Sequence, residues 1–152
     1  MPALRFNHME LTLPTGALAR DRDAIIAFYG EVFGFDAIDV PLFDSSGLLL
    51  RTDAETSQFL LLMEQEKYLH SPGFDHLGFL YETRVEVDEK LASCKQWQKK
   101  DDRVRIKEYD DLIISPTTTH AFYVQYLLPI WFDIQVIEYD QGTAPQKSWI
   151  YR

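Results

Sequence analysis

The residues best suited to chemistry are two histidines that stand in the same short pattern. His8 lies in Phe6-Asn7-His8-Met9, and His76 lies 68 residues later in Phe74-Asp75-His76-Leu77. Neutral imidazole is a common ligand of transition metals, so two histidines that converge would form part of a metal site. A pattern that occurs twice also predicts that the chain consists of two similar halves.

Alternation along the predicted strands indicates which face carries these groups. Met9, Leu11 and Leu13 share one face of the first strand, so His8 points to the opposite, polar face. The predicted strands 117–126 and 131–139 alternate in the same way, with Phe122 and Val124 on one face of the first of them. The polar faces of these three strands carry His8, Glu10, Thr12, Tyr123, Gln125, Asp133 and Gln135.

The remaining patterns predict two copies of a βαβββ unit. Asp21 is expected to cap a first helix that ends at Gly34, and Thr83 with Glu86 forms the capping-box pattern of a second. Cys94 falls on the apolar stripe of the second helix and is expected in the core. Strands are predicted over residues 5–13, 36–41, 47–52, 58–65, 73–81, 104–109, 117–126 and 131–139.

Each candidate also has an ordinary structural interpretation. Two histidines rarely suffice for a metal site, and Glu10 or Glu64 could add a carboxylate, although a solvated strand edge explains both equally well. A single histidine in a strand, such as His120, is more often a hydrogen-bonded structural residue than a functional one. The paired histidines could also serve only as hydrogen-bond donors to a ligand.

Composition excludes several classes of function. The 152 residues carry a formal charge of −9, which would repel nucleic acid and anionic membrane surfaces. No apolar run approaches the roughly 20 residues that span a bilayer, and residues 1–13 lack the pattern of a signal peptide. Cys94 is the only cysteine, so an internal disulfide is impossible and the reducing cytoplasm is the expected location.

The segment Ile26-Ala27-Phe28-Tyr29-Gly30-Glu31-Val32-Phe33-Gly34-Phe35, which follows the strand with His8, resembles the opening module of the vicinal oxygen chelate superfamily. This superfamily includes glyoxalases, bleomycin-resistance proteins and extradiol dioxygenases. The resemblance covers about residues 4 to 140. It implies an α+β fold in which two βαβββ modules form a cupped mixed sheet with helices on the outer face.

The resemblance also implies roles for individual residues. His8 and His76 match metal-ligand positions, whereas Gln135 stands where a glutamate ligand is expected and brings no charge. The implied metal is Fe, Mn, Ni or Zn. Tyr123 matches a tyrosine that lines the site, and the apolar connection 127–131 could form a wall for a ligand.

Two functions follow as hypotheses. The first is a small-molecule enzyme of glyoxalase or extradiol dioxygenase type, with a divalent metal on His8, His76 and Gln135 and with Tyr123 or His120 in catalysis. The alternative is a metal-free protein that binds or sequesters an aromatic ligand. In either case Glu10, Thr12, Gln125, Asp133 and Trp131 are expected to contact the ligand.

The expected organisation is one domain, with module one at 4–66, module two at 72–140 and a C-terminal tail at 141–152. The resemblance implies a homodimer, since chains with one pair of modules often complete their cups by pairing. The tail carries Trp149 and Tyr151 and is expected to dock on the second subunit.

Overall fold

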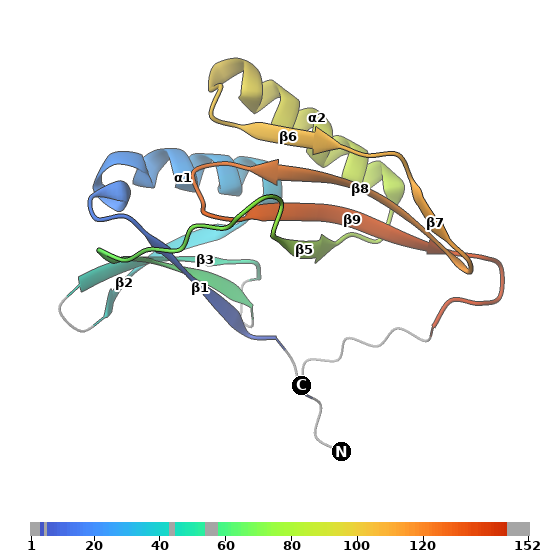
Figure 1. Ribbon diagram of the computed structural model, residues 1–152, viewed down its shortest axis with the longest axis horizontal. Coiled ribbons are helices and arrows are strands. Elements are labelled where there is room, and N and C mark those ends of the chain that lie inside the picture. Colours follow the sequence, from blue (N-terminus) through green and yellow to red (C-terminus); the bar gives the residue numbers. More distant parts are fainter. Residues whose placement is uncertain (1–3, 5, 43–44, 54–57, 146–152) are drawn as a thin grey trace.

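The computed structural model describes residues 4, 6–42, 45–53 and 58–145 (Figure 1). Trp149 and Tyr151 of the predicted docking tail lie outside the described residues. In chain order the elements are β1 (His8–Leu13), α1 (Ala17–Phe33), β2 (Asp36–Leu42), β3 (Ser45–Arg51), β4 (Phe59–Glu64), β5 (His76–Leu80), α2 (Arg84–Lys100), β6 (Arg105–Glu108), β7 (Leu112–Ile114), β8 (Thr117–Gln125) and β9 (Trp131–Tyr139).

The strands form two mixed sheets, one from each module. The first has the order β1-β4-β3-β2 and the second the order β5-β9-β8-β6, and in both the first strand of the module pairs in parallel with the last. Both helices lie on the same side of the strands (Figure 1). The predicted α+β fold of two modules is confirmed, and neither of the described helices lies over the opposite side of a sheet, which we call the helix-free side.

The second module contains one strand that the alternation pattern did not predict. β7 pairs with the far end of β8, beyond the end of β6. Its three residues, Leu112, Ile113 and Ile114, are all exposed, so the strand has no buried face and gives no alternation signal. The second module is therefore βαββββ in the described part of the chain.

The helix ends agree with the sequence except at the start of α1. The capping box of Thr83 and Glu86 is present at α2, and Gly34 ends α1 with a φ of 73°. Asp21, however, lies inside α1, which begins after Gly16. The predicted cap was wrong because Glu64 of β4 accepts hydrogen bonds from the backbone N–H groups of Gly16 and Leu18, a contact that only the fold creates.

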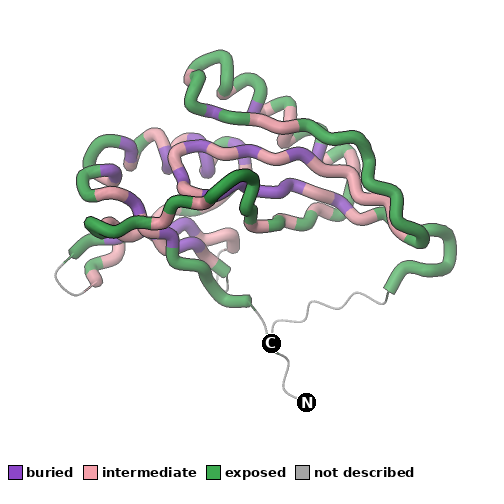
Figure 2. The backbone as a smooth tube through the Cα atoms, in the orientation of Figure 1, coloured by how far each residue is buried: buried purple, intermediate pink, exposed green. Residues whose placement is uncertain are grey.

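The two modules share one hydrophobic core between the helices and the sheets (Figure 2). Phe28 of α1 lies with its ring centroid 5.5 Å from that of Trp97 in α2 and 4.6 Å from that of Tyr126. The hydroxyl of the buried Tyr29 donates a 2.7 Å hydrogen bond to the carbonyl of Tyr126. Cys94 is fully buried in this core, as predicted.

Candidate functional site

The site is built around His76 at the start of β5. Its Nδ1 lies 2.9 Å from the carbonyl oxygen of Phe74, which can only accept, so Nδ1 carries the proton and donates. This leaves Nε2 of a neutral ring with a lone pair, the form that binds a metal or accepts a proton. Nε2 lies 3.8 Å from Oδ2 of Asp133 on the neighbouring strand β9.

Asp133 is an unusual carboxylate because it is buried with one oxygen unsatisfied. Its residue exposure is 8%, and Oδ1 has no hydrogen-bond partner among the described residues. Burial raises the pKa of Asp133, and the nearby His76 only partly offsets this effect. A buried acceptor without a donor costs free energy, so Asp133 is a candidate for contact with a ligand or a cation.

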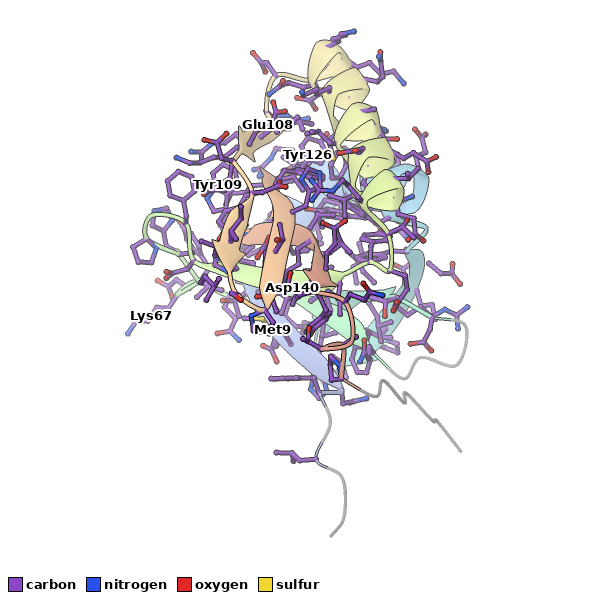
Figure 3. All side chains as sticks on the ribbon, turned by 90° about the vertical axis from the view of Figure 1, so that its right-hand side faces the viewer. Met9, Lys67, Glu108, Tyr109, Tyr126 and Asp140 are labelled. Carbon is purple, nitrogen blue, oxygen red and sulfur yellow. The ribbon has the colours of Figure 1, made fainter. Side chains whose placement is uncertain are left out.

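Aromatic side chains enclose the pair on the helix-free side of the second sheet. The ring of Tyr123 lies 4.6 Å from that of His76 and 4.7 Å from that of Tyr109. Figure 3 shows Tyr109 on the side of the sheet away from α2, whereas Tyr126 lies beneath that helix. Burial raises the pKa of Tyr123, and the negative charge of Asp133 raises it further. Tyr123 therefore remains a neutral hydrogen-bond donor at physiological pH.

His8 occupies the corresponding position in the first sheet but has different neighbours. Its ring stacks on Phe59 of β4 at 4.8 Å, and its Nδ1 lies 2.7 Å from Oδ1 of Asn7. The amide oxygen can only accept, so Nδ1 donates and Nε2 of the neutral ring is again the free nitrogen. Both histidines face the helix-free side of their sheets, but no contact among the described residues joins them. Their convergence on one metal stays a prediction.

The other predicted ligands of this face fall into three groups. Gln135 shares its face of β9 with Asp133, and its amide lies over Gly78, where an added Cβ would be 3.3 Å from Nε2. Glu10 is exposed on β1, on the same face as His8. Thr12 has a structural role, because its hydroxyl accepts a 2.6 Å hydrogen bond from the backbone N–H of Leu69 in the connection between the modules.

His120 is not part of this site. Its neighbour on the same strand, Tyr123, faces the helix-free side, whereas His120 points toward α2 and contacts Asp88 through Nε2 at 2.8 Å and Asp111 through Nδ1 at 2.7 Å. The expectation of a catalytic base needed an inward side chain, and these two carboxylates hold it on the other face. His120 is a structural residue in an ion network that also includes Arg84 and Glu138.

The network predicts a pH-dependent stability. Burial lowers the pKa of His120, and so does the positive charge of Arg84. The hydrogen bonds to Asp88 and Asp111 outweigh both effects and raise the pKa above its ordinary value. A raised folded-state pKa adds stability that is complete below the unfolded-state pKa of about 6.5 and is lost as pH rises through the folded value. We expect His120→Gln to cost about 1–2 kcal/mol at pH 6 and less at pH 8.5.

Urea unfolding of the wild-type protein and the variant at these two pH values measures the difference in cost. The control is His70→Gln, at an exposed position, which should change the free energy of unfolding little at either pH. An equal cost of His120→Gln at both pH values would show that the imidazolium form is not what holds α2 to β8.

Beside the His76 cluster lies a cavity of about 550 Å³. It lies between the connection from β4 to β5 and the turn from β8 to β9, and Leu127, Leu128 and Pro129 line it as the predicted apolar wall. Gln125 and Trp131, both predicted to contact a ligand, line it as well. Trp131 is 4% exposed, and its indole N–H donates to the carbonyl of Gly73 at 3.1 Å.

Sequence reasoning missed four residues of this face. Arg105 and Lys107 lie on β6, opposite Gln125 and Tyr123 of β8. Phe74 and Tyr109 extend the aromatic surface around Tyr123. The signal for the two cations was available, because they alternate with Ile106 in the predicted strand 104–109 and so share its polar face. The same signal was available for Phe74 and Tyr109, which share the faces of His76 and Lys107 in the predicted strands 73–81 and 104–109, although in the structure both lie just outside β5 and β6.

The residues that the structure describes contain neither a compact metal-ligand cluster nor a membrane-spanning helix. Among them, no group of three or more His, Cys, Asp or Glu side chains converges in a way that could hold a metal ion. For a metal ion, His76 and Asp133 would supply two donors, and a third would have to come from an amide or from another surface. No described helix has the length and apolarity needed to cross a membrane.

Comparison by sequence finds no family model and no curated protein that matches the chain. Comparison by structure finds many similar folds. A virulence protein of Salmonella typhimurium has a TM-score of 0.58 at 21% identity, over 90% of this chain and 98% of that one. A lactoylglutathione lyase of Agrobacterium tumefaciens has a TM-score of 0.57 at 18% identity, and the match covers 90% of this chain and 96% of the lyase. The fosfomycin resistance protein FosX of Listeria monocytogenes has a TM-score of 0.59 at 16% identity, and the match covers 88% of this chain and 90% of FosX.

These proteins share a fold with the chain rather than a close sequence. The chain has the same fold as the lyase and the resistance protein, and the likeness extends over about nine tenths of its length. Identities of 16% to 21% say nothing of a shared reaction or metal. The activity must be argued from the site itself.

Proposed function

We propose that the chain is a small-molecule enzyme of glyoxalase or extradiol dioxygenase type that uses a divalent metal on the helix-free face of its sheets. The observation that supports this most is the pair of His76 and Asp133. Nε2 of His76 has its lone pair directed away from the Phe74 carbonyl, and the buried carboxylate 3.8 Å away has an oxygen without a donor. A cation would satisfy both groups.

The metal would be held by His76 and Asp133, with His8 and the amide oxygen of Gln135 as further donors. Asp133 thus supplies the negative charge that Gln135 lacks. A bound Fe, Mn, Ni or Zn ion would polarise adjacent oxygens of the substrate as a Lewis acid. Tyr123, as a neutral donor beside His76, would orient the substrate by a hydrogen bond.

We further propose that the chain acts as a homodimer. His8 belongs to the first sheet and His76 to the second, and each has a free Nε2 but no contact with the other. Pairing of two copies would place the first sheet of one copy beside the second sheet of its partner, so that each metal site would contain His8 from one copy and His76 from the other. The helix-free face of the first sheet, which carries Leu49, Leu61 and Met63, would be covered in the same step.

Metal content and metal affinity test this function. Protein purified without chelator or affinity tag is expected to hold stoichiometric Fe, Mn, Ni or Zn, and His8→Ala with His76→Ala should abolish it, because both imidazoles are proposed ligands. If Gln135 is a ligand, Gln135→Glu should tighten metal binding, since a carboxylate adds charge. His120→Gln is the control, because His120 lies on the other face of β8, where Asp88 and Asp111 hold its ring.

The same samples report the oligomer. Sedimentation should show a dimer at micromolar concentration. Mixing the His8→Ala and His76→Ala chains should restore one intact site in each heterodimer, and none in either homodimer, if the histidines come from different subunits. Failure of the wild-type protein to bind Fe(II) or Zn(II) at saturating concentration would contradict the enzyme proposal.

The alternative is a metal-free protein that binds an aromatic ligand. The aromatic side chains around the cavity favour it, and so does the lack of a convergent group of three His, Cys, Asp or Glu side chains among the described residues. A protein that binds aromatic compounds but takes up no metal would support this second function.

A further inference from the structure

The second sheet carries two cations, Arg105 and Lys107, that have no acidic partner among the described residues, and Arg105 is the only described arginine of which this is true. Arg20, Arg22, Arg51, Arg84 and Arg103 each form an ion pair with an aspartate or glutamate. Arg105 forms none among the described residues, although the chain has nine more acidic than basic residues overall. Lys107, on the same face of the same strand, also has no carboxylate within ion-pair distance among these residues.

Both cations are held in place by uncharged groups. The guanidinium of Arg105 lies 4.8 Å from the ring centroid of Trp131, and its Nη1 donates to Oε1 of Gln125 at 3.0 Å. Gln125 is itself fixed, because its Nε2 donates to the carbonyl of Leu128. Stacking on an aromatic ring sets the plane of a guanidinium and leaves its other N–H groups free for a planar anion.

Lys107 is positioned in the same manner. Its Nζ lies 4.4 Å from the ring centroid of Phe74 and 5.4 Å from that of Tyr109. Phe74 in turn lies 5.1 Å from Trp131, so one aromatic surface supports both cations. A cation oriented without a neutralising partner keeps its full charge for a ligand.

The two cations border the hollows of this face. Arg105 lines the cavity of about 550 Å³, and Arg105 and Lys107 both line an adjoining hollow of about 400 Å³ that shares Phe74 and Trp131. Asp102 also lines the second hollow, but it forms no ion pair with either cation. The hydroxyl of Ser71, at the first cavity, is buried without a hydrogen-bond partner among the described residues.

We propose that Arg105 and Lys107 form a subsite for the anionic group of a small molecule, a carboxylate or a phosphoryl group carried on an apolar or aromatic body. The aromatic surface of Phe74 and Trp131 would contact the body, and the two cations would bind the anion. This inference rests on the proposed function, because it names the substrate class of the same face, but anion binding here needs no metal.

The test uses four small probes and the metal-free protein in chelator. Benzoate and phenyl phosphate carry the two anions, and benzamide and benzyl alcohol are their uncharged counterparts. Titration calorimetry is expected to show benzoate or phenyl phosphate binding at least about tenfold more tightly than the uncharged probes, a difference that shrinks between about 0.05 and 0.5 M NaCl. Whichever anion binds more tightly identifies its class.

Arg105→Gln and Lys107→Gln should each weaken anion binding about tenfold or more and leave the uncharged probes unchanged. Arg22→Gln and Lys99→Gln remove the same charge from other surfaces and should change nothing, which separates the subsite from the overall field of the protein. His76→Ala should retain anion binding while it loses metal, so failure of the two proposals can be told apart.

Equal affinity for charged and uncharged probes would overturn the subsite. So would equal effects of the subsite variants and their controls, or the absence of any binding of the anions at about 10 mM, which corresponds to less than about 3 kcal/mol. Thermal melting of each variant verifies that it is folded.

Discussion

Asp133→Asn is expected to make the protein more stable and, in the same step, to weaken the proposed metal binding strongly. Asp133 is 8% exposed, has one oxygen without a hydrogen-bond donor, and gains only a 3.8 Å approach to His76. A buried charge in such surroundings destabilises the fold, so the neutral amide should add about 1–2 kcal/mol to the free energy of unfolding. For a chain of this length the melting temperature should rise by roughly 2–8 °C.

The same substitution should weaken metal affinity by at least about 100-fold, because under the proposed function Asp133 is a charged ligand rather than a supporting contact. Urea unfolding and metal titration on the same preparation measure the two effects. Asp39→Asn is the control, since this carboxylate is exposed and already paired with Arg22. A loss of stability in Asp133→Asn would show that the carboxylate supports the fold, and the proposed role for Asp133 would then fail.

Phe28→Ala is expected to destabilise the whole chain by about 3–5 kcal/mol, the range for deleting a large buried ring. The ring is fully buried and contacts Tyr29, Trp97 and Tyr126, so its loss opens a cavity between α1, α2 and the end of β8. Because these contacts join the two modules, both should unfold in a single transition at lower urea concentration.

Circular dichroism and tryptophan fluorescence should report the same midpoint, which moves downward in Phe28→Ala. Phe6→Ala removes an equal volume at a position that is 91% exposed and should change the midpoint little. Two separate transitions in the wild-type protein would show that the modules are independent domains, against the shared core.

Much of the fold can be predicted from the sequence. The repeated Phe-Asn/Asp-His pattern marks β1 and β5 as equivalent strands, and the spacing of apolar residues places both helices, because local period and capping chemistry are properties of neighbouring residues. The alternation in β1, β8 and β9 likewise gives the correct faces of His8, Tyr123 and Asp133. These signals also sufficed to predict the fold, which the chain shares with solved structures of 16% and 18% identity.

The partners of each side chain were decided by the tertiary structure. Glu64 caps α1 from 46 residues away, and His120 is drawn to α2 by Asp88 and Asp111, neither of which any local pattern connects to it. The carboxylate beside His76 is Asp133 rather than the residue at 135, because the register of β5 on β9 sets which side chains meet. Hydrogen bonds and burial depend on residues distant in the chain, so the sequence determined which groups share a face, and the packing of the strands determined which of them touch.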